Sequence, residues 1–308
     1  MNPLISVIMG VYNQYDEQAL KAAVSSVLDQ TLGDLEFIIW DDGSDERAGA
    51  LLRQLPSLDE RIILAGREEN RGLAFSLNEC IKIARGKYIA RMDADDYSFP
   101  ARLEKQVAFL EDHPEYGWCG TSAELFDEDG TWGVRIMPEV PSVRDFYKYS
   151  PFIHPSVVFR AGLFFDDNGY SEDGETLRCE DYEIFMKLMK RGVRGYNLPE
   201  ILFRYREDIA SYEKRNIRTR FRESKIRYRN FRDMKMLFPL GWIYVLRPVA
   251  ACLLPHFIVR IIKRSEGRMV KRKVDAKAYK DDRSSIGKIS EVHREKTLPL
   301  SGVKKVTG

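Results

Sequence analysis

Short apolar runs alternate with helical patterns along the first hundred residues. Four runs rich in β-branched and other apolar residues predict strands, at residues 4–11, 35–40, 62–65 and 88–92. Between them, apolar residues recur at helical spacing over 20–28 and 77–84. Strands that alternate with helices of about a dozen residues are typical of βαβ units. The sequence therefore predicts an α/β fold with a mostly parallel sheet and flanking helices.

The pattern from residue 98 to about 212 combines further helices with a hairpin. Pro100 precedes apolar positions at helical spacing from Leu103 to Leu110, which predicts a helix there. Residues 127–130 have the composition of a hairpin turn. Another helix is predicted to begin at Glu180, because acidic residues in a first helical turn interact favourably with the helix dipole.

The chain changes character near residue 213. Residues 1–213 carry 23 basic and 39 acidic side chains, whereas residues 214–273 carry 18 basic and 3 acidic ones. Apolar and aromatic residues recur at helical spacing among these basic residues. Residues 213–273 are therefore predicted to form a basic amphipathic helical segment. The tail at 274–308 has little apolar periodicity and is predicted to be disordered.

An apolar stretch at residues 236–262 decides how the basic segment is interpreted. Its uncharged runs, 236–246 and 248–259, are shorter than the roughly 20 residues that a transmembrane helix needs. A solvated helical face, nucleic-acid binding and attachment to an anionic membrane surface all fit the charge. Only membrane attachment accounts for the charge and the apolar stretch together, and no nucleic-acid-binding motif is present. We therefore predict peripheral membrane attachment and no nucleic acid partner.

Composition excludes several classes of protein. The chain has 308 residues, of which 44% are hydrophobic and 31% charged, which argues against wholesale disorder, collagen and a polytopic membrane protein. The four cysteines include no Cys-x-x-Cys pair, so a disulfide framework or a zinc site is poorly supported and a reducing compartment is expected. Because the first apolar run begins at residue 4, no secretory signal is expected. These features predict a cytoplasmic protein.

Acidic and amide side chains follow three of the predicted strands. Asn13 follows the first strand, Asp41 and Asp42 follow the second, and Asp93 and Asp95 follow the fourth. Ligands of open α/β sheets bind at the carboxyl ends of the strands. Two carboxylates with one residue between them can face one divalent cation, and oxygen ligands suit Mg²⁺ or Mn²⁺. A solvated acidic loop or a helix cap is the alternative for Asp93 and Asp95, and a plain turn is the alternative for Asp41 and Asp42.

Eight segments occur in the order and spacing of a known family. They are residues 7–13, 41–44, 70–73, 91–96, 154–156 and 180–183, together with Ser25, Val27, Leu28, Gln30 and Thr31 and with Pro100, Arg102 and Leu103. Over residues 4–212 the chain resembles the family 2 inverting glycosyltransferases of the GT-A fold, especially bacterial enzymes that extend polysaccharide or O-antigen units. The resemblance implies a catalytic domain at 1–212, with a nucleotide-binding half at about 1–97 and an acceptor-binding half at about 98–212.

The resemblance also implies roles for particular positions. Binding of the nucleotide sugar is expected of Val11, Asn13, Asp42, Asn70, Arg71, Gly72 and Asp93. Asp93 is expected near the ribose, and Asp95 on a Mg²⁺ or Mn²⁺ ion that bridges the diphosphate. Asp181 is expected to be the catalytic base, with Glu180 and His154 on the acceptor side.

The implied reaction agrees with the chemistry of these side chains. A nucleoside diphosphate leaves with developing negative charge, which a divalent cation stabilises. Inversion by single displacement needs one base, whereas double displacement needs a second, nucleophilic carboxylate. We therefore predict a metal-dependent inverting glycosyltransferase at the inner face of the cell membrane. Its donor is expected to be a UDP-, dTDP- or GDP-linked sugar, and its saccharide acceptor is expected to be lipid-linked.

One departure from the family leaves an alternative open. Relatives often carry Tyr-Arg-x-His after the helix of the base, and here residues 205–208 are Tyr-Arg-Glu-Asp. An acidic Asp208 would repel a diphosphate unless it binds metal. The alternative is a catalytically inactive nucleotide-binding or membrane-scaffolding protein of the same fold. A dehydrogenase and a P-loop phosphotransferase are less well supported, because their glycine motifs are absent.

Overall fold

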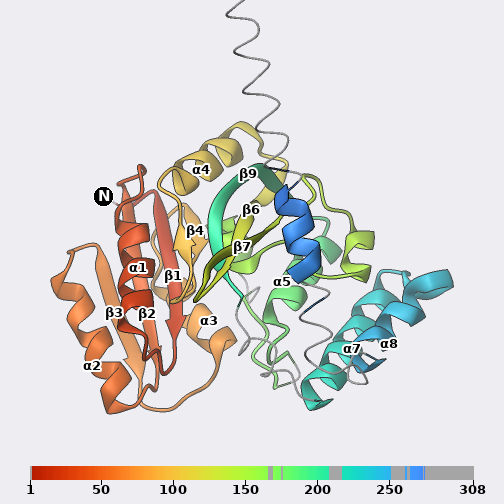
Figure 1. The fold of residues 1–308 in the computed structure, drawn as a ribbon, viewed down its shortest axis with the longest axis horizontal. Helices are drawn as coiled ribbons and strands as arrows, with labels where there is room; N and C mark the ends of the chain where they lie inside the picture. The colour runs from red at the N-terminus through yellow and green to blue at the C-terminus, as the bar shows by residue number, and fades with distance from the viewer. Residues whose placement is uncertain are drawn as a thin grey trace, which may run out of the picture.

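A single large sheet forms the centre of the protein (Figure 1). The computed structural model describes residues 2–165, 169–174, 176–207, 217–250, 261, 264–272 and 274. Within these residues the sheet has nine strands in the order β3-β2-β1-β4-β8-β6-β9-β5, with β7 paired to β6. The strands are β1 (Ile5–Val11), β2 (Leu35–Asp42), β3 (Ile62–Arg67), β4 (Tyr88–Arg91), β5 (Tyr97–Ser98), β6 (Tyr116–Asp127), β7 (Gly130–Arg135), β8 (Val158–Arg160) and β9 (Arg194–Arg206).

Helices lie on both sides of this sheet. The α-helices are α1 (Glu17–Leu28), α2 (Glu46–Gln54), α3 (Leu73–Ile83), α4 (Arg102–Asp112), α5 (Glu180–Lys190), α7 (Ile217–Asp233) and α8 (Trp242–Ala250). Short helical turns are η1 (Leu55–Ser57), η2 (Val143–Tyr147), η3 (His154–Ser156), η4 (Ala161–Phe164) and η5 (Leu237–Gly241). The predicted helices near residues 20, 77, 103 and 180 are thereby confirmed.

The amino-terminal half is the predicted parallel α/β unit. Strands β3, β2, β1 and β4 pair in parallel. Side chains alternate across them, so Val7 and Phe37 lie in one apolar cluster with α1, whereas Ile8 and Ile38 lie in a second cluster with Leu77 of α3. Because both faces are covered, these strands are mostly apolar, and the buried polar side chains of Ser6 and Glu36 hydrogen-bond to each other. Their carboxyl ends meet at one edge, as predicted.

The carboxy-terminal half of the sheet is mixed and curls back on the first half. Strand β8 pairs antiparallel with both β4 and β6, and β6 pairs in parallel with the strongly curved β9 (Figure 1). The hairpin predicted at 127–130 joins β6 to β7. Residues 92–96 connect β4 to β5, which pairs with β9 at the far end of the strand order. Since a residue spans at most about 3.6 Å, this short link must lie where the two parts of the sheet approach each other.

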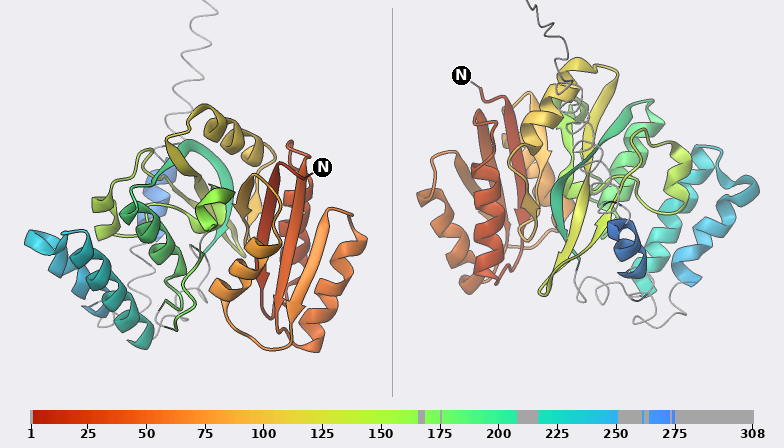
Figure 2. Two further views of the ribbon diagram at one scale, coloured as in Figure 1. Left: turned by 180° about the vertical axis from the view of Figure 1, so that it is seen from behind. Right: turned by 45° about the horizontal axis from the view of Figure 1, so that its top comes forward.

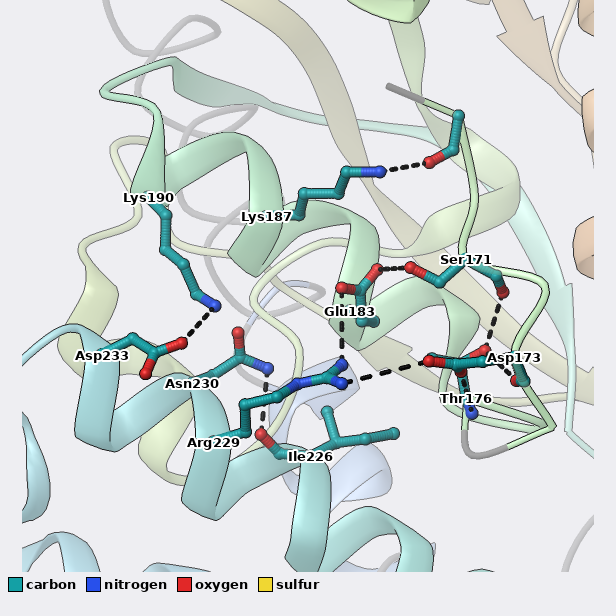
Figure 3. A network of polar contacts seen from close by, with 11 residues as sticks. Ser171, Asp173, Thr176, Glu183, Lys187, Lys190, Ile226, Arg229, Asn230 and Asp233 are labelled. Atoms are coloured by element: carbon teal, nitrogen blue, oxygen red, sulfur yellow. Dashed lines mark hydrogen bonds and ion pairs between the residues drawn. The ribbon is translucent and has the colours of Figure 1, made fainter. Parts of the chain in front are cut away.

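Helices α7 and α8 lie at the end of the molecule opposite α2 and β3 (Figures 1 and 2). Ile226 and Phe231 of α7 are buried in the second apolar cluster. Figure 3 shows the polar contacts that join α7 to α5. Lys190 Nζ lies 3.1 Å from Asp233 Oδ2, and Arg229 Nη2 lies 3.8 Å from Glu183 Oε1. The predicted basic helical segment therefore begins with a helix that packs against the rest of the protein.

The structure also describes part of the apolar stretch. It contains the turn η5 and the helix α8, whose described residues end at Ala250. No helix in the described ranges is both long and apolar enough to cross a membrane. The predicted disordered tail at 274–308 lies outside the described residues except for residue 274.

Candidate active site

Three carboxylates come together in the link between β4 and β5. Oxygen atoms of Asp93, Asp95 and Asp96 all lie within 4.8 Å of one another. Arg91 of β4 is buried and forms an ion pair with Asp93. Asp96 is also buried, and its Oδ1 accepts a hydrogen bond of 2.7 Å from the backbone N–H of Arg206. Its Oδ2 has no hydrogen-bond partner among the described residues.

This cluster has the properties of a site for a divalent cation. Burial raises the pKa of Asp96 well above its usual value, and the nearby charges of Asp95 and Asp93 raise it further. Three carboxylates this close repel one another, and a buried oxygen without a partner costs free energy. An oxygen-ligated cation such as Mg²⁺ or Mn²⁺ would remove both costs. The residues present therefore fit the predicted metal, to which Asp96 offers a carboxylate oxygen in addition to that of Asp95.

Asp42 joins the end of β2 to the loop that precedes α3. Its two carboxylate oxygens accept hydrogen bonds from the backbone N–H groups of Arg71 at 3.0 Å and Gly72 at 2.6 Å. The Asn70 side-chain amide donates to the backbone oxygen of Asp42 at 3.2 Å. Burial raises the pKa of Asp42, and these backbone hydrogen bonds act in the opposite direction. Asp42, Asn70, Arg71 and Gly72 thus form one connected group.

Glycine is required in the turn between these loops. Gly43 has a φ of +76°, and a Cβ atom there would lie 2.6 Å from the carbonyl oxygen of Glu68. A side chain at this position would therefore be strained by its backbone conformation and would collide with backbone. The Asp-Asp-Gly-Ser segment at 41–44 consequently has a conformational role, as its composition predicts.

Val11 and Asn13 lie at the end of β1, next to this group. The backbone N–H of Asn13 donates to Ser44 Oγ at 3.0 Å, and the Asn13 side-chain oxygen accepts from the backbone N–H of Asp45 at 2.9 Å. The Val11 side chain is buried in the first apolar cluster. A contact between Val11 and a ligand would therefore have to use its backbone.

The predicted base lies in the first turn of α5, together with Glu180. Burial raises the pKa of the nearby Tyr170 hydroxyl, the positive charge of Arg91 lowers it, and the charges on Asp181, Asp93 and Glu180 raise it. Burial also raises the pKa of Glu180.

His154 is buried beside the same tyrosine. Its Nε2 and the Tyr170 hydroxyl share a hydrogen bond of 2.7 Å. Burial, followed by the positive charge of Arg91, holds the pKa of His154 well below its usual range. The imidazole is therefore neutral at physiological pH, and its contact with an acceptor stays a prediction.

The structure brings the predicted residues that follow β1, β2 and β4 to one edge of the sheet. Strand β1 lies between β2 and β4, so the group around Asp42 is separated from Asp93 by about two strand spacings, on the order of 10 Å. Residues 205–208 are the ones that depart from the family pattern. The backbone N–H of Arg206 donates to Asp96, and Asp208 lies outside the described residues.

Sequence reasoning missed two polar residues of this site. Arg91 is an arginine at the end of the apolar strand β4, directly before the acidic cluster, and that placement was a usable signal. Tyr170 gave no signal, because it lies in an irregular segment and reaches the site only through the fold.

A family model and several known proteins match this chain. The model described as Glycosyl transferase family 2 matches residues 6–167. EpsE of Bacillus subtilis, which is named as a glycosyltransferase, is 37% identical over 273 residues that cover 86% of this chain and 97% of EpsE. The O-antigen biosynthesis glycosyltransferase WbnJ of Escherichia coli is 31% identical, covering 68% of this chain and 82% of WbnJ. The amylovoran biosynthesis glycosyltransferase AmsE of Erwinia amylovora is 30% identical, covering 69% and 79%.

Solved structures share the fold at low sequence identity. TarS of S. aureus (residues 1–349), in complex with UDP-GlcNAc, has a TM-score of 0.59 and 18% identity, covering 83% of this chain and 73% of that one. The mannosyltransferase PcManGT from Pyrobaculum calidifontis, in complex with GDP-Man and Mn²⁺, has a TM-score of 0.56 and 18% identity, covering 91% and 87%. These likenesses show that the fold is of the predicted GT-A type.

Proposed function

The chain belongs to glycosyl transferase family 2, and from this membership we propose that it is a metal-dependent inverting enzyme of cell-surface polysaccharide synthesis. It is a glycosyltransferase, as the family model and the named relatives indicate. The proposed reaction moves a sugar from a nucleotide-diphosphate donor to a saccharide acceptor. The observation that carries the proposal is the meeting of Asp93, Asp95 and Asp96 in one cluster directly after β4.

The acidic cluster is the proposed site of the divalent cation. Asp95 and Asp96 would supply carboxylate oxygens to it, and Asp93, which forms an ion pair with Arg91, is proposed to contact the ribose. When bound, Mg²⁺ or Mn²⁺ neutralises negative charge that develops on the departing diphosphate. The complex of PcManGT with GDP-Man and Mn²⁺ supports this assignment by analogy of fold.

The donor nucleotide is proposed to lie along the ends of β1 and β2. Asp42 fixes the backbone of residues 71 and 72, and Asn13 fixes the turn at 44 and 45. These hydrogen bonds keep the rim of the site in one shape before the donor arrives, which reduces the entropic cost of binding. A UDP-, dTDP- or GDP-linked sugar fits the proposal, and TarS and PcManGT bind donors of the first and last kinds.

Asp181 is proposed to accept the proton of the acceptor hydroxyl. It lies at the amino-terminal turn of α5, which is attached to α7 by the contacts of Figure 3. One positioned carboxylate is sufficient for inversion by single displacement. Glu180 and His154 lie on the proposed acceptor side of this base.

A panel of donors tests the proposed function directly. We expect the full-length protein to bind at least one of UDP-glucose, UDP-GlcNAc, dTDP-rhamnose or GDP-mannose saturably when Mn²⁺ is present, measured by isothermal titration calorimetry. Binding should weaken at least tenfold when EDTA removes the metal, because the diphosphate then faces unscreened carboxylates. Folded protein that binds none of a wider nucleotide-sugar panel with either Mg²⁺ or Mn²⁺ would refute the proposal.

Attachment to a membrane is proposed for the surface of η5 and α8. We call the exposed side chains of Phe238, Leu240, Trp242, Ile243 and Leu246 the apolar ridge. Phe238 is 79% exposed and Ile243 is 64% exposed, whereas Val245 and Pro248 face inward. Exposed basic side chains, including Arg218 in α7 and Lys235 just after this helix, belong to the same basic segment. Apolar side chains beside cations are the pattern that binds an anionic bilayer surface, where a lipid-linked acceptor would lie.

Replacing three ridge residues should release the protein from lipid. We expect Phe238→Gln, Ile243→Gln and Leu246→Gln together to lower the partition coefficient onto phosphatidylglycerol vesicles at least tenfold in sedimentation. Each of these side chains contributes about 1.5–3 kcal/mol when fully buried, and none is buried within the protein, so the melting temperature should change little. Leu58→Gln with Val140→Gln, which are also exposed apolar residues, is the matched control. Equal partitioning of the ridge variant and the control would exclude this surface.

A further inference from the structure

A basic cavity lies between the β6–β7 hairpin and the helix of residues 264–272. Its volume is about 380 Å³, and it is separate from the acidic cluster. The residues that carry the inference are Thr131, Trp132, Arg264, Arg268, Lys271 and Arg272. Figure 1 shows this helix in blue beside β7. The proposed donor and acceptor residues do not line the cavity.

The cavity has more positive than negative charge. Its lining contains four cationic side chains and the two carboxylates Asp127 and Asp129. Arg264 forms an ion pair with Asp127, and Lys271 donates to the backbone oxygen of Thr131 at 3.1 Å. Arg268 and Arg272 have no ion-pair partner in the part of the chain that the structure describes. Arginine in this state has donors available for an anion.

The walls of the cavity are closely packed. A Cβ atom on Gly133 would lie 3.1 Å from the backbone of Gly267, so the helix touches β7 through two glycines. Trp132 is buried, and the Arg264 guanidinium lies 5.5 Å from the centre of its ring. The Trp132 indole N–H has no acceptor among the described residues. A buried N–H donor without a partner is costly, and an anion in the cavity is one source of an acceptor.

A short chain of backbone contacts connects this cavity to the proposed active site. Asp127 follows Phe126, whose carbonyl oxygen accepts from the N–H of Glu207 at 3.0 Å. The neighbouring Arg206 donates its N–H to Asp96. Strands β6 and β9 are adjacent in the sheet, so the hairpin end of the cavity lies on the order of 10 Å from the acidic cluster. That separation suits two parts of one substrate.

We propose that this cavity binds a phosphate or diphosphate group carried by the acceptor substrate. The inference rests on the proposed function, which supplies the acceptor, and it adds a recognition site on the far side of the transferred sugar. The unpaired guanidinium groups of Arg268 and Arg272 bind the phosphate oxygens, and the rigid hairpin and helix set the distance from that phosphate to the acceptor hydroxyl at Asp181. An acceptor without phosphate therefore binds more weakly.

Binding of inorganic pyrophosphate in EDTA tests the site without donor or transfer. Removal of metal leaves the acidic cluster repulsive to anions, so binding then reports the cavity. We call the double substitution Arg268→Gln with Arg272→Gln the cavity variant. We expect it to weaken pyrophosphate binding at least tenfold in calorimetry. Arg144→Gln with Arg191→Gln, two exposed arginines outside the basic segment and a control of equal charge change, should alter it less than twofold. Equal binding by the cavity variant and the wild type overturns the proposal.

Two further measurements separate the cavity from other anion sites. Pyrophosphate should change the tryptophan emission of the wild type, and Trp132→Phe should abolish that change; a change that persists places the anion elsewhere and overturns the proposal. Decyl diphosphate in detergent and phosphatidylglycerol vesicles distinguish the source of the phosphate. The cavity variant should lose decyl diphosphate binding at least tenfold and vesicle binding less than twofold. An equal loss of both overturns the acceptor assignment in favour of a lipid headgroup.

Failure of this inference can be told apart from failure of the proposed function. The same cavity variant is titrated with the donor and Mn²⁺, and we expect its donor affinity to stay within twofold of the wild type. Loss of pyrophosphate binding with unchanged donor binding supports the inference. Absence of donor binding in the wild type refutes the proposed function, and the pyrophosphate titration still decides whether the cavity binds an anion.

Discussion

Exchange of Asp95 for asparagine is expected to lower kcat/KM at least about a thousandfold. The substitution keeps the shape of the side chain and removes one of the three carboxylates that lie within 4.8 Å of one another. Stabilisation of a departing diphosphate by a cation contributes several kcal/mol to the transition state, and about 4 kcal/mol corresponds to a thousandfold in rate. Initial rates with the donor identified in the binding panel, measured over a range of Mn²⁺ concentrations, check this expectation.

The metal dependence separates a lost ligand from a damaged fold. EDTA should reduce the wild-type rate to the level of Asp95→Asn, and added Mn²⁺ should restore the wild type but not the variant. Asp112→Asn, an exposed acid at the end of α4, removes the same charge away from the site and should keep its rate within twofold. A wild-type rate that EDTA does not affect, together with an active Asp95→Asn, would contradict the metal-dependent mechanism.

The parallel half of the fold could be predicted because its signals are local. Apolar runs such as Ile5–Val11 are buried on both faces, and turn residues end them. Helix α2 (Glu46–Gln54) gave no such signal, since much of it is charged or polar and few of its side chains are buried. It is started instead by Asp45, whose side chain accepts from the backbone N–H of Ala48 at 3.0 Å.

The curled half of the sheet could not be predicted from local patterns. Strand β5 has two residues, and its pairing partner in β9 is more than a hundred residues away, with Tyr97 opposite Arg204. Such a pairing depends on the whole chain being folded and has little effect on the local sequence. It nevertheless brings the N–H of Arg206 to Asp96, and thereby shapes the acidic cluster.

The acidic residues of the site were visible in the sequence, whereas their partners were not. Carboxylates at strand ends such as Asp42 and Asp93 have a recognisable position and chemistry. Other polar groups of the site come from distant segments: Tyr170, which shares a hydrogen bond with His154, comes from an irregular segment, and the backbone N–H that binds Asp96 comes from Arg206 of β9. Burial of His154 was likewise not predictable, because a histidine before a proline gives no indication of what covers it.

Exchange of Asp181 for asparagine is expected to abolish transfer and to leave donor binding intact. A positioned general base contributes about 10²- to 10⁴-fold to such reactions, so kcat should fall by about a thousandfold. The donor dissociation constant in Mn²⁺ should stay within threefold of the wild type, because the nucleotide is proposed to lie on β1 and β2 and not on α5. Calorimetry with the donor and single-turnover transfer assays measure the two quantities on the same preparations.

The position of Asp181 requires a control for helix stability. An acid in the first turn of a helix contributes about 0.3–1 kcal/mol through the helix dipole, so Asp181→Asn should lower the melting temperature slightly. Glu46→Gln removes a first-turn acid from α2 and matches that effect, but it should leave kcat within twofold. A protein that acts only as a scaffold would show no transfer in the wild type and no difference between these variants. Transfer by Asp181→Asn at more than a tenth of the wild-type rate would assign the proton to another group, and Glu180 would then be the first to replace.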